Sequence, residues 1–548
     1  MTTRTKAKIP APKVAAKPQG AKESGAKTSP AKPPAAKAAT VKAKAKAKAD
    51  ESANFPRLTH PEIRAIVIGI MLAMFLGALD QTIVATALPT IGRYFGDLEN
   101  LSWIVTAYLL TATAVTPLYG KLSDIHGRRM MLLIAIGLFV AGSIACALAP
   151  SMTALVFSRA LQGLGGGGLM ALSQTIIADI VSPRERGRYQ GYIGAVFATS
   201  SVGGPVLGGF LTEHLNWTYI FWINLPLGFA ALGMTSSVLK RVPFQPRQHT
   251  LDLIGAVLMV AAAVSLLLAL SWGGRRFDWI SGPTGALALF SAACWGLFAW
   301  RLIVAREPFL PLAVLGNPVV RCAALGGACV MGTLVGMTIF TPLYFETVLH
   351  LSASQSGLAL IPLLGSTVLF STLSGRAMTR LTHYKRMPLA GLTLGIVSLA
   401  ALAIWPAAMP TALVLALLFC VGAGLGSLFP ISTVCMQNAV SAAQMGVATG
   451  AANFFRALFS ALVVAVLGAI VLGGLGGVTG MSVEMLARAA SAGELAYAFR
   501  FVFMAAALVL AFALTFTIAM EERPLKGPAD APSPAATTPQ APATPIPE

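Results

Sequence analysis

The sequence has few charged residues and lacks the pattern of a nucleotide-binding loop. Asp, Glu, Lys and Arg make up 11% of the 548 residues, whereas apolar residues make up 56%. A soluble domain needs more polar surface than this, so the composition excludes an ordinary soluble protein and indicates one solvated by lipid. Neither GxxxxGKS nor GxxxxGKT occurs, which excludes an ATP site of the phosphate-loop type.

Cysteine and histidine are also scarce. The six cysteines lie in apolar segments without a CxxC pair and without histidines close in sequence, so they are expected to be small core residues. The apolar segments hold neither a nucleophile with a base and a third group nor a His/Glu metal spacing. We therefore predict no enzymatic activity, no cofactor and no metal site.

Basic residues outnumber acidic ones, and many of them lie at the start of the chain. The formal net charge is +19, and residues 1–60 repeat Lys, Ala and Pro, a composition typical of disorder. No apolar stretch with a cleavage site follows, so we do not expect a signal peptide. Three interpretations of this tail stay open: a solvated linker or retention signal, a segment attracted to anionic lipid, or a salt-sensitive tether to DNA. We expect no specific nucleic-acid partner.

Apolar segments of about 20 residues recur along the rest of the chain, and a helix of that length crosses a bilayer with its own backbone hydrogen bonds satisfied. The sequence therefore predicts an all-α, polytopic membrane protein with 14 transmembrane helices. The predicted spans are residues 65–90, 101–119, 130–149, 154–180, 190–211, 218–239, 251–272, 284–304, 319–345, 356–375, 387–405, 411–437, 446–472 and 497–520.

Lys and Arg gather in every second loop between these spans. Lys121, Arg186 and Arg376 lie in one set of loops, whereas the opposite set holds few basic residues, Arg93 among them. Basic loops are retained in the cytoplasm, so an even number of spans places both termini there. The expected location is the cell (inner) membrane.

Two loops resemble each other. Residues 118–132 (LYGKLSDIHGRRMML) and 373–389 (LSGRAMTRLTHYKRMPL) both start with Gly and a basic residue and end with two basic residues and Met. Internal repeats are common in secondary transporters, so we predict a 6 + 2 + 6 arrangement. Its parts are a basic tail (1–60), a six-helix bundle (61–241), two additional helices and a linker (242–318), a second six-helix bundle (319–520) and a disordered cytoplasmic tail (521–548).

The loop after the second predicted span, GKLSDIHGRR, resembles the loop signature of the major facilitator superfamily. Its glycines permit close backbone approach and a tight turn. In that family the aspartate and the first arginine form a charge network with an acidic residue ending the fourth span, and this network locks one of two alternating states. An ordinary basic loop that fixes topology is the alternative. The residues concerned are Gly120, Asp124, Gly127, Arg128, Arg129 and Asp179.

The first span contains LDQTIVATALP, which resembles a motif of the fourteen-span drug:proton antiporters within this superfamily. A carboxyl group inside a span costs roughly 2.5–3.5 kcal/mol on insertion scales, so Asp80 is expected to face a polar cavity and to take and release a proton or bind a cation. The alternative is a carboxylate that is paired structurally with a neighbouring helix.

The fourth span contains SRALQGLG, which resembles the family's intramembrane arginine motif. In the family this arginine, here Arg159, is linked to proton transfer. The alternative is an arginine that extends to water at the outer face. The GLGGGG run that follows also matches GxGxxG, but a dinucleotide site needs a strand before it, so close packing of neighbouring helices is the better interpretation.

The fifth span resembles the antiporter signature of the superfamily, with Ser200 in place of one glycine. Its proline kinks the helix, and its glycines give a smooth face to a partner helix. The residues of this motif are Gly191, Gly204, Pro205, Gly208 and Gly209.

The second half has fewer ionisable groups. Glu346 at the end of the ninth span and Arg456 in the thirteenth could both line a transport pathway, although interfacial or structural roles are alternatives. Apolar walls with one or two carboxylates would suit lipophilic compounds.

The resemblance implies a proton-coupled antiporter that exports lipophilic, often cationic drugs or toxic compounds by alternating access. An exporter of one endogenous metabolite or lipid-like solute is the alternative. The expected partners are a small-molecule substrate, protons and membrane lipid, and it stays open whether a periplasmic adaptor protein completes the path.

Overall fold

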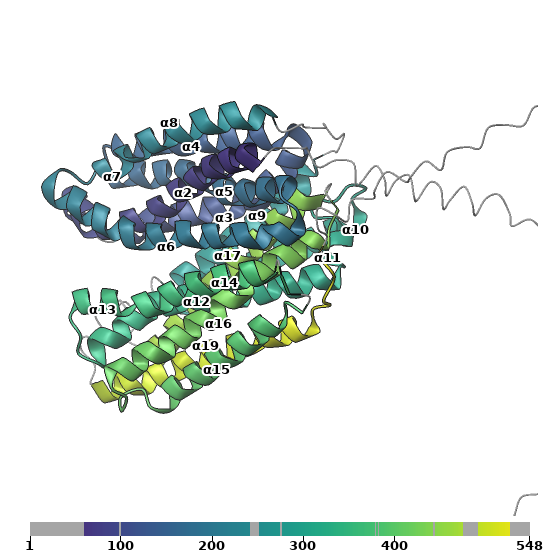
Figure 1. Ribbon diagram of the computed structural model, residues 1–548. Coiled ribbons are helices and arrows are strands. Elements are labelled where there is room, and N and C mark those ends of the chain that lie inside the picture. The colour runs from purple at the N-terminus through teal and green to yellow at the C-terminus, as the bar shows by residue number, and fades with distance from the viewer. Residues whose placement is uncertain are drawn as a thin grey trace, which may run out of the picture. The chain divides into compact units, whose positions relative to one another are not determined.

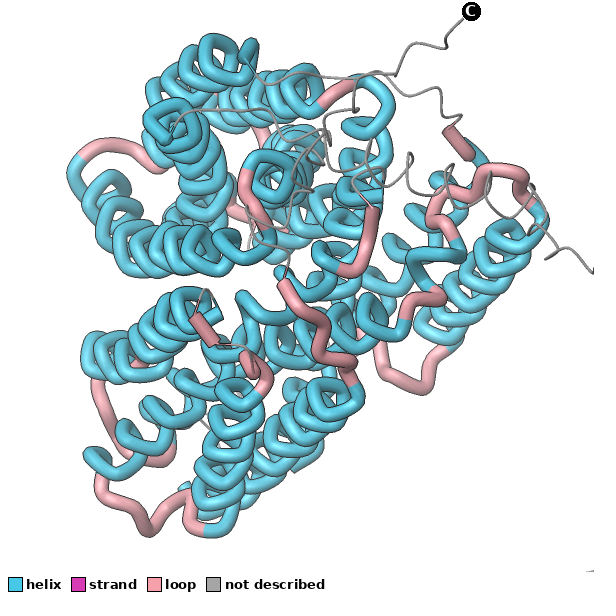
Figure 2. Tube along the Cα trace, turned by 45° about the vertical axis from the view of Figure 1, so that its right-hand side comes forward, coloured by secondary structure: helices cyan, strands magenta, loops and turns pink. Residues whose placement is uncertain are grey.

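The computed structural model describes residues 60–97, 100–241, 251–273, 277–378, 380–381, 383–441, 444–474 and 492–525. Within these ranges the regular structure is helical and no β-strand occurs, as Figure 1 and Figure 2 show. The predicted basic tail up to residue 59 and residues 526–548 of the second tail lie outside the described residues.

The helices lie where apolar segments occur in the sequence. The first set is α2 (His60–Phe95), α3 (Leu101–His126), α4 (Arg128–Ala147), α5 (Met152–Ile180), α6 (Pro183–His214), α7 (Tyr219–Trp222) and α8 (Asn224–Val238). Two long helices follow, α9 (Leu253–Trp272) and α10 (Gly282–Val304), and then the short α11 (Leu312–Leu315). The last set is α12 (Pro318–Thr347), α13 (Ala353–Ala359), α14 (Ile361–Met378), α15 (Arg386–Ile404), α16 (Thr411–Asn438), α17 (Met445–Gly474) and α19 (Ala492–Ala519).

Twelve helices of the described chain are long and apolar enough to cross a membrane. The predicted spans 101–119 and 154–180 fall on α3 and α5, which are 26 and 29 residues long but are not among the twelve. Helix α5 contains a run of glycines and several polar side chains that are buried against its neighbours. An all-α, multi-span protein is therefore confirmed, whereas the count of fourteen stays a prediction.

The first set of helices shares an apolar core between α2, α3, α4, α5 and α8. The glycine run of α5 lies within this core, and it is helical. A Cβ atom on Gly165 would overlap the backbone of Phe139 in α4, and one on Gly167 would overlap the carbonyl oxygen of Ala112 in α3. The run therefore lets α3 and α4 pack directly against the α5 backbone, as the packing interpretation predicts.

The last set of helices has its own core, which runs from α12 through α14, α15, α16 and α17 to α19. Tyr344 of α12 anchors it, with its ring centroid 5.3 Å from that of Phe499 and 5.1 Å from that of Phe503 in α19. These edge-on aromatic contacts add to the apolar burial that holds the set together.

Helices α9 and α10 form a pair beside these cores. Asp252 caps the start of α9 and forms an ion pair with Arg301 of α10 (Nε to Oδ1, 3.1 Å). Their apolar side chains pack with Phe309 and with Phe454 of α17. The pair therefore packs partly against a helix of the last set.

The first and last sets meet along a seam formed mainly by α3 with α17 and by α6 with α14 (Figure 1). Glycines make this approach possible. A Cβ atom on Gly120 would lie 2.5 Å from the carbonyl oxygen of Gly446, and Gly187 and Gly375 face each other with equally little room. The Gly120 contact lies within residues 120–129, so the two sets touch at the end of the molecule that carries this segment.

Candidate functional site

Asp80 lies in the middle of α2, and its relative exposure is 0%. Its Oδ2 accepts a hydrogen bond from Arg159 Nη1 (2.7 Å), and its Oδ1 accepts from Gln162 Nε2 (2.8 Å) and Asn224 Nδ2 (2.9 Å). The carboxylate therefore joins α2 to α5 and α8 through three charge-assisted hydrogen bonds.

Arg159 completes this buried network from α5. Its side chain is 1% exposed, its Nε donates to the carbonyl oxygen of Ile104 (3.1 Å), and its guanidinium lies 4.4 Å from the ring centroid of Tyr108. Gln162 also donates to Ser143 of α4 (2.7 Å). The alternative in which Arg159 extends to water is therefore wrong, because its charge is compensated inside the core.

The surroundings of Asp80 differ from an open polar cavity. Every polar contact comes from neighbouring helices, so the pairing that was the alternative for Asp80 is present in this state. A buried ion pair is stable only with good geometry and extra hydrogen bonds, and both are present. Proton exchange at Asp80 would require this network to open.

Residues 120–129, which were expected to form a loop, are helical except for Gly127: they are the end of α3 and the start of α4. This segment, called the loop here, carries a second charged cluster. Arg128 lies 2.5 Å from Asp124 (Nη1 to Oδ1) and 2.8 Å from Asp179 (Nε to Oδ2). Arg128 stands at the first position of α4, and Asp179 is next to the last residue of α5. One guanidinium therefore connects the ends of three helices.

Asp124 also contacts the last set of helices. Its Oδ2 accepts a hydrogen bond from the backbone N–H of Val447 at the start of α17 (3.2 Å). A Cβ atom on Gly446 would lie 2.6 Å from Arg128 Nη1 and 2.7 Å from Asp124 Oδ1. Burial raises the pKa of the Asp124 carboxyl, and the Arg128 guanidinium opposes this rise. The cluster thus sits directly on the seam.

The other residues of this loop have separate roles in the structure. Gly127 has φ 97°, a conformation that favours glycine, and it is the single residue between α3 and α4. Arg129 points away from the ion pairs and donates to the carbonyl oxygen of Ser236 beyond the middle of α8 (3.1 Å). Gly120 lies on the seam opposite Gly446.

The predicted antiporter segment of α6 faces two different helices. A Cβ atom on Gly204 or Gly208 would overlap Thr82 or Thr86 of α2, and Gly191 lies against Thr372 of α14 with only 3.0 Å for a Cβ atom. Near Gly209 no atom lies within 4 Å of a Cβ position. Pro205 is exposed.

The two candidate residues of the second half lie apart from each other. Glu346 is exposed near the end of α12. Arg456 is buried within α17, 5% exposed, and donates to Asn453 Oδ1 (3.2 Å), Ser432 Oγ (3.3 Å) and Thr433 Oγ1 (2.9 Å). Neither joins the Asp80 network or the loop cluster.

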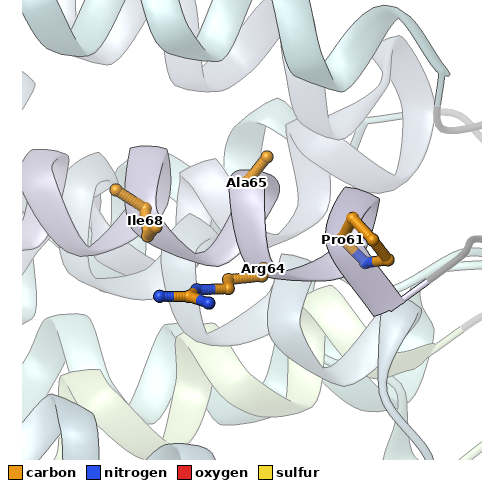
Figure 3. A pocket seen from close by; sticks show the side chains of 4 residues that line it. All are labelled: Pro61, Arg64, Ala65 and Ile68. Carbon is orange, nitrogen blue, oxygen red and sulfur yellow. The ribbon is translucent and has the colours of Figure 1, made fainter.

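A shallow surface pocket lies at the start of α2. Figure 3 shows the four residues that line it, and none of them is a predicted site residue. The lining residues are Pro61, Arg64, Ala65 and Ile68.

The model of the Major Facilitator Superfamily matches residues 70–464, most of the chain. The chain belongs to this superfamily. The buried network and the loop cluster described above both lie within the matched residues.

Curated members of the superfamily include similar transporters. An uncharacterized MFS-type transporter of Mycobacterium tuberculosis is 36% identical over 74% of this chain, and the match spans 58% of that relative's length. The multidrug transporter protein MdtP of Bacillus subtilis is 34% identical over 74% of each chain, and the efflux pump dotC of Dothistroma septosporum is 33% identical over 73% of this chain and 70% of its own. This chain is thus a multi-pass membrane protein of the MFS type.

Solved structures share the major facilitator fold. The human organic anion transporter MFSD10 superposes with a TM-score of 0.57 at 16% identity, covering 82% of this chain and 100% of its own. A bacterial homologue of the iron transporter ferroportin in an outward-facing state gives 0.59 at 14% identity, covering 85% and 100%. At these identities the likeness shows the fold alone.

The sequence assigned no role to two polar residues of the Asp80 network. Gln162 lies one turn after Arg159, and Asn224 starts α8, and both donate to Asp80. The signal that could have found them is their position, since uncharged amides inside apolar spans usually hydrogen-bond to another polar group.

Proposed function

We propose that the chain is a proton-coupled antiporter that exports lipophilic, often cationic drugs or toxic compounds. The observation that carries this proposal is the Asp80 carboxyl, which is fully buried and held by Arg159 together with two amides. Protonation of Asp80 would cancel the attraction to Arg159 and loosen α2 from α5, so proton binding and helix movement would be linked. The names of the Bacillus and Dothistroma relatives agree with export.

The seam supports alternating access between two six-helix bundles over residues 61–241 and 319–520, with 242–318 as the additional part. Separate apolar cores support this division. At the loop end the bundles meet through close contacts between glycines and through the Asp124 to Val447 hydrogen bond. The basic loops favour a cytoplasmic position for that end and for both termini, so this state would be closed to the cytoplasm of the cell.

Transport into proteoliposomes tests the proposal. The probe is the ethyl ester of rhodamine B, a lipophilic cation, and a pH gradient with an acidic interior is imposed across the membrane. The expected result is accumulation of the dye that stops when an ionophore collapses the gradient and the potential. Accumulation that is unchanged by the ionophore would refute proton coupling. A panel of unrelated lipophilic cations that are all ignored would favour a single endogenous solute.

A further inference from the structure

Arg456 is a buried cation without a carboxylate partner in the described part of the chain. Its three hydrogen-bond acceptors are an amide oxygen and two hydroxyl oxygens, all of them neutral. A guanidinium has five N–H donors, and Nε makes no hydrogen bond to any described residue. The hydrogen bonds to its positively charged group therefore come from neutral acceptors alone.

The other buried arginines show how unusual this is. Arg159 is paired with Asp80. Arg186, at the start of α6, donates to the carbonyl oxygens of Val181 and Ala178 at the end of α5, where a helix presents partial negative charge. Arg456 lies well inside α17, where the carbonyls are used by the helix itself. It has neither form of compensation.

The neighbours of Arg456 place it beside the seam. Asn453, one turn before it on α17, accepts from Arg456 and donates through Nδ2 to Gln174 Oε1 of α5 (3.1 Å). The ring of Phe429 lies 5.4 Å from the guanidinium, and a Cβ atom on Gly327 of α12 would lie 3.1 Å from Nε. A cation, polar hydroxyls and an aromatic face are thus gathered next to the contact between the two sets of helices.

We infer that Arg456 binds an anionic group of the transported compound, so that the substrates include lipophilic molecules with a carboxylate, alone or as zwitterions. This inference rests on the proposed export of lipophilic compounds and adds the substrate class. The free N–H groups of the guanidinium donate to the carboxylate oxygens, and the bound charge compensates a cation that is otherwise unpaired. Phe429 offers apolar contact to the rest of the molecule.

A matched dye pair tests the inference on the full-length protein in lipid nanodiscs. Rhodamine B carries one carboxylate, and its ethyl ester replaces that charge with a neutral ester group that is larger by one ethyl group. We expect Arg456→Gln to weaken rhodamine B binding by about tenfold or more while ester binding changes little. Arg456→Lys, which keeps the charge without the planar fork, should restore part of the preference. If Arg456 were only structural, Arg456→Gln and Arg456→Lys would each change the binding of the two dyes equally.

Further measurements show which result would overturn the inference. Equal affinity of the unaltered protein for both dyes, or equal loss of both in Arg456→Gln, would overturn the inference. Replacing gluconate by chloride distinguishes a small inorganic anion: if chloride raises the unfolding temperature through Arg456 but rhodamine B has no advantage over its ester, the assignment to a substrate carboxylate is wrong. Failure of proton-driven ester transport in proteoliposomes would instead refute the proposed function and leave the binding result standing.

Discussion

The Asp80→Asn substitution removes the charge and the proton exchange of this group while keeping its size. The carboxylate accepts hydrogen bonds from three side chains, and an amide offers only one oxygen to them. Arg159 would become a buried cation without a counter-ion, so we expect the free energy of unfolding to fall by about 3–5 kcal/mol. Proton-driven transport should fall to background, because the carboxyl group proposed to exchange the proton is gone.

A double variant separates stability from coupling. Asp80→Asn with Arg159→Gln removes both charges, so its loss of stability should be smaller than the sum of the two single losses by about 1–3 kcal/mol. Proton-driven transport should stay at background in the double variant. The assays are denaturant-induced unfolding of the purified protein and dye uptake into proteoliposomes, with Asp97→Asn beyond the exposed end of α2 as the matched control. Full proton-driven transport in Asp80→Asn, or its return in the double variant, would refute the role of Asp80.

Three further predictions concern the seam, the loop cluster and the tail. Gly375→Ala would place a methyl group on the facing backbone of α6. The closed state should therefore be destabilised by about 1–3 kcal/mol relative to the open state, and spin-label distances between α6 and α14 measure the shift in population. Gly365→Ala, where no atom lies within 4 Å of a Cβ position, is the control on the same helix, and an equal effect there would contradict the packing argument. Arg128→Gln leaves Asp124 buried without a cation, and burial raises the pKa of that carboxyl. In Arg128→Gln the same spin-label distances should therefore report a seam that is fully closed below the ordinary aspartate pKa and opens as pH rises through the raised pKa of Asp124. The control Arg129→Gln should behave like the unaltered protein. A seam whose distances do not depend on pH in Arg128→Gln would count against this. Deleting the basic tail should leave dye transport in proteoliposomes unchanged, and a loss of transport would show that the tail is required.

The membrane class and the helical fold could be read from the sequence because lipid imposes a simple rule on each span. Runs of about 20 apolar residues can only be helices in a bilayer, and most predicted spans coincide with long helices. The count of fourteen stays a prediction, because α3 and α5 are not among the twelve helices of the described chain that are long and apolar enough to cross a membrane. Their polar residues and glycines face other helices, and composition alone cannot say whether such residues meet lipid or protein.

The candidate site was only partly predictable. Motif resemblance drew attention to Asp80 and Arg159, but their pairing depends on two helices that lie far apart in sequence. The roles of Gln162 and Asn224 follow from the same packing. That Arg456 has no carboxylate partner among the described residues could not be predicted for the same reason, since a missing neighbour can be recognised only when the helices around the side chain are in place.

Proton movement driven by the substrate tests the central claim most directly. A gradient of the rhodamine B ester is imposed across proteoliposomes at equal pH, and the interior pH is followed with a trapped indicator. Antiport through Asp80 predicts protons moving against the direction of the dye in the unaltered protein and no such movement in Asp80→Asn. Dye movement without proton movement in the unaltered protein, or equal proton movement in Asp80→Asn, would contradict it.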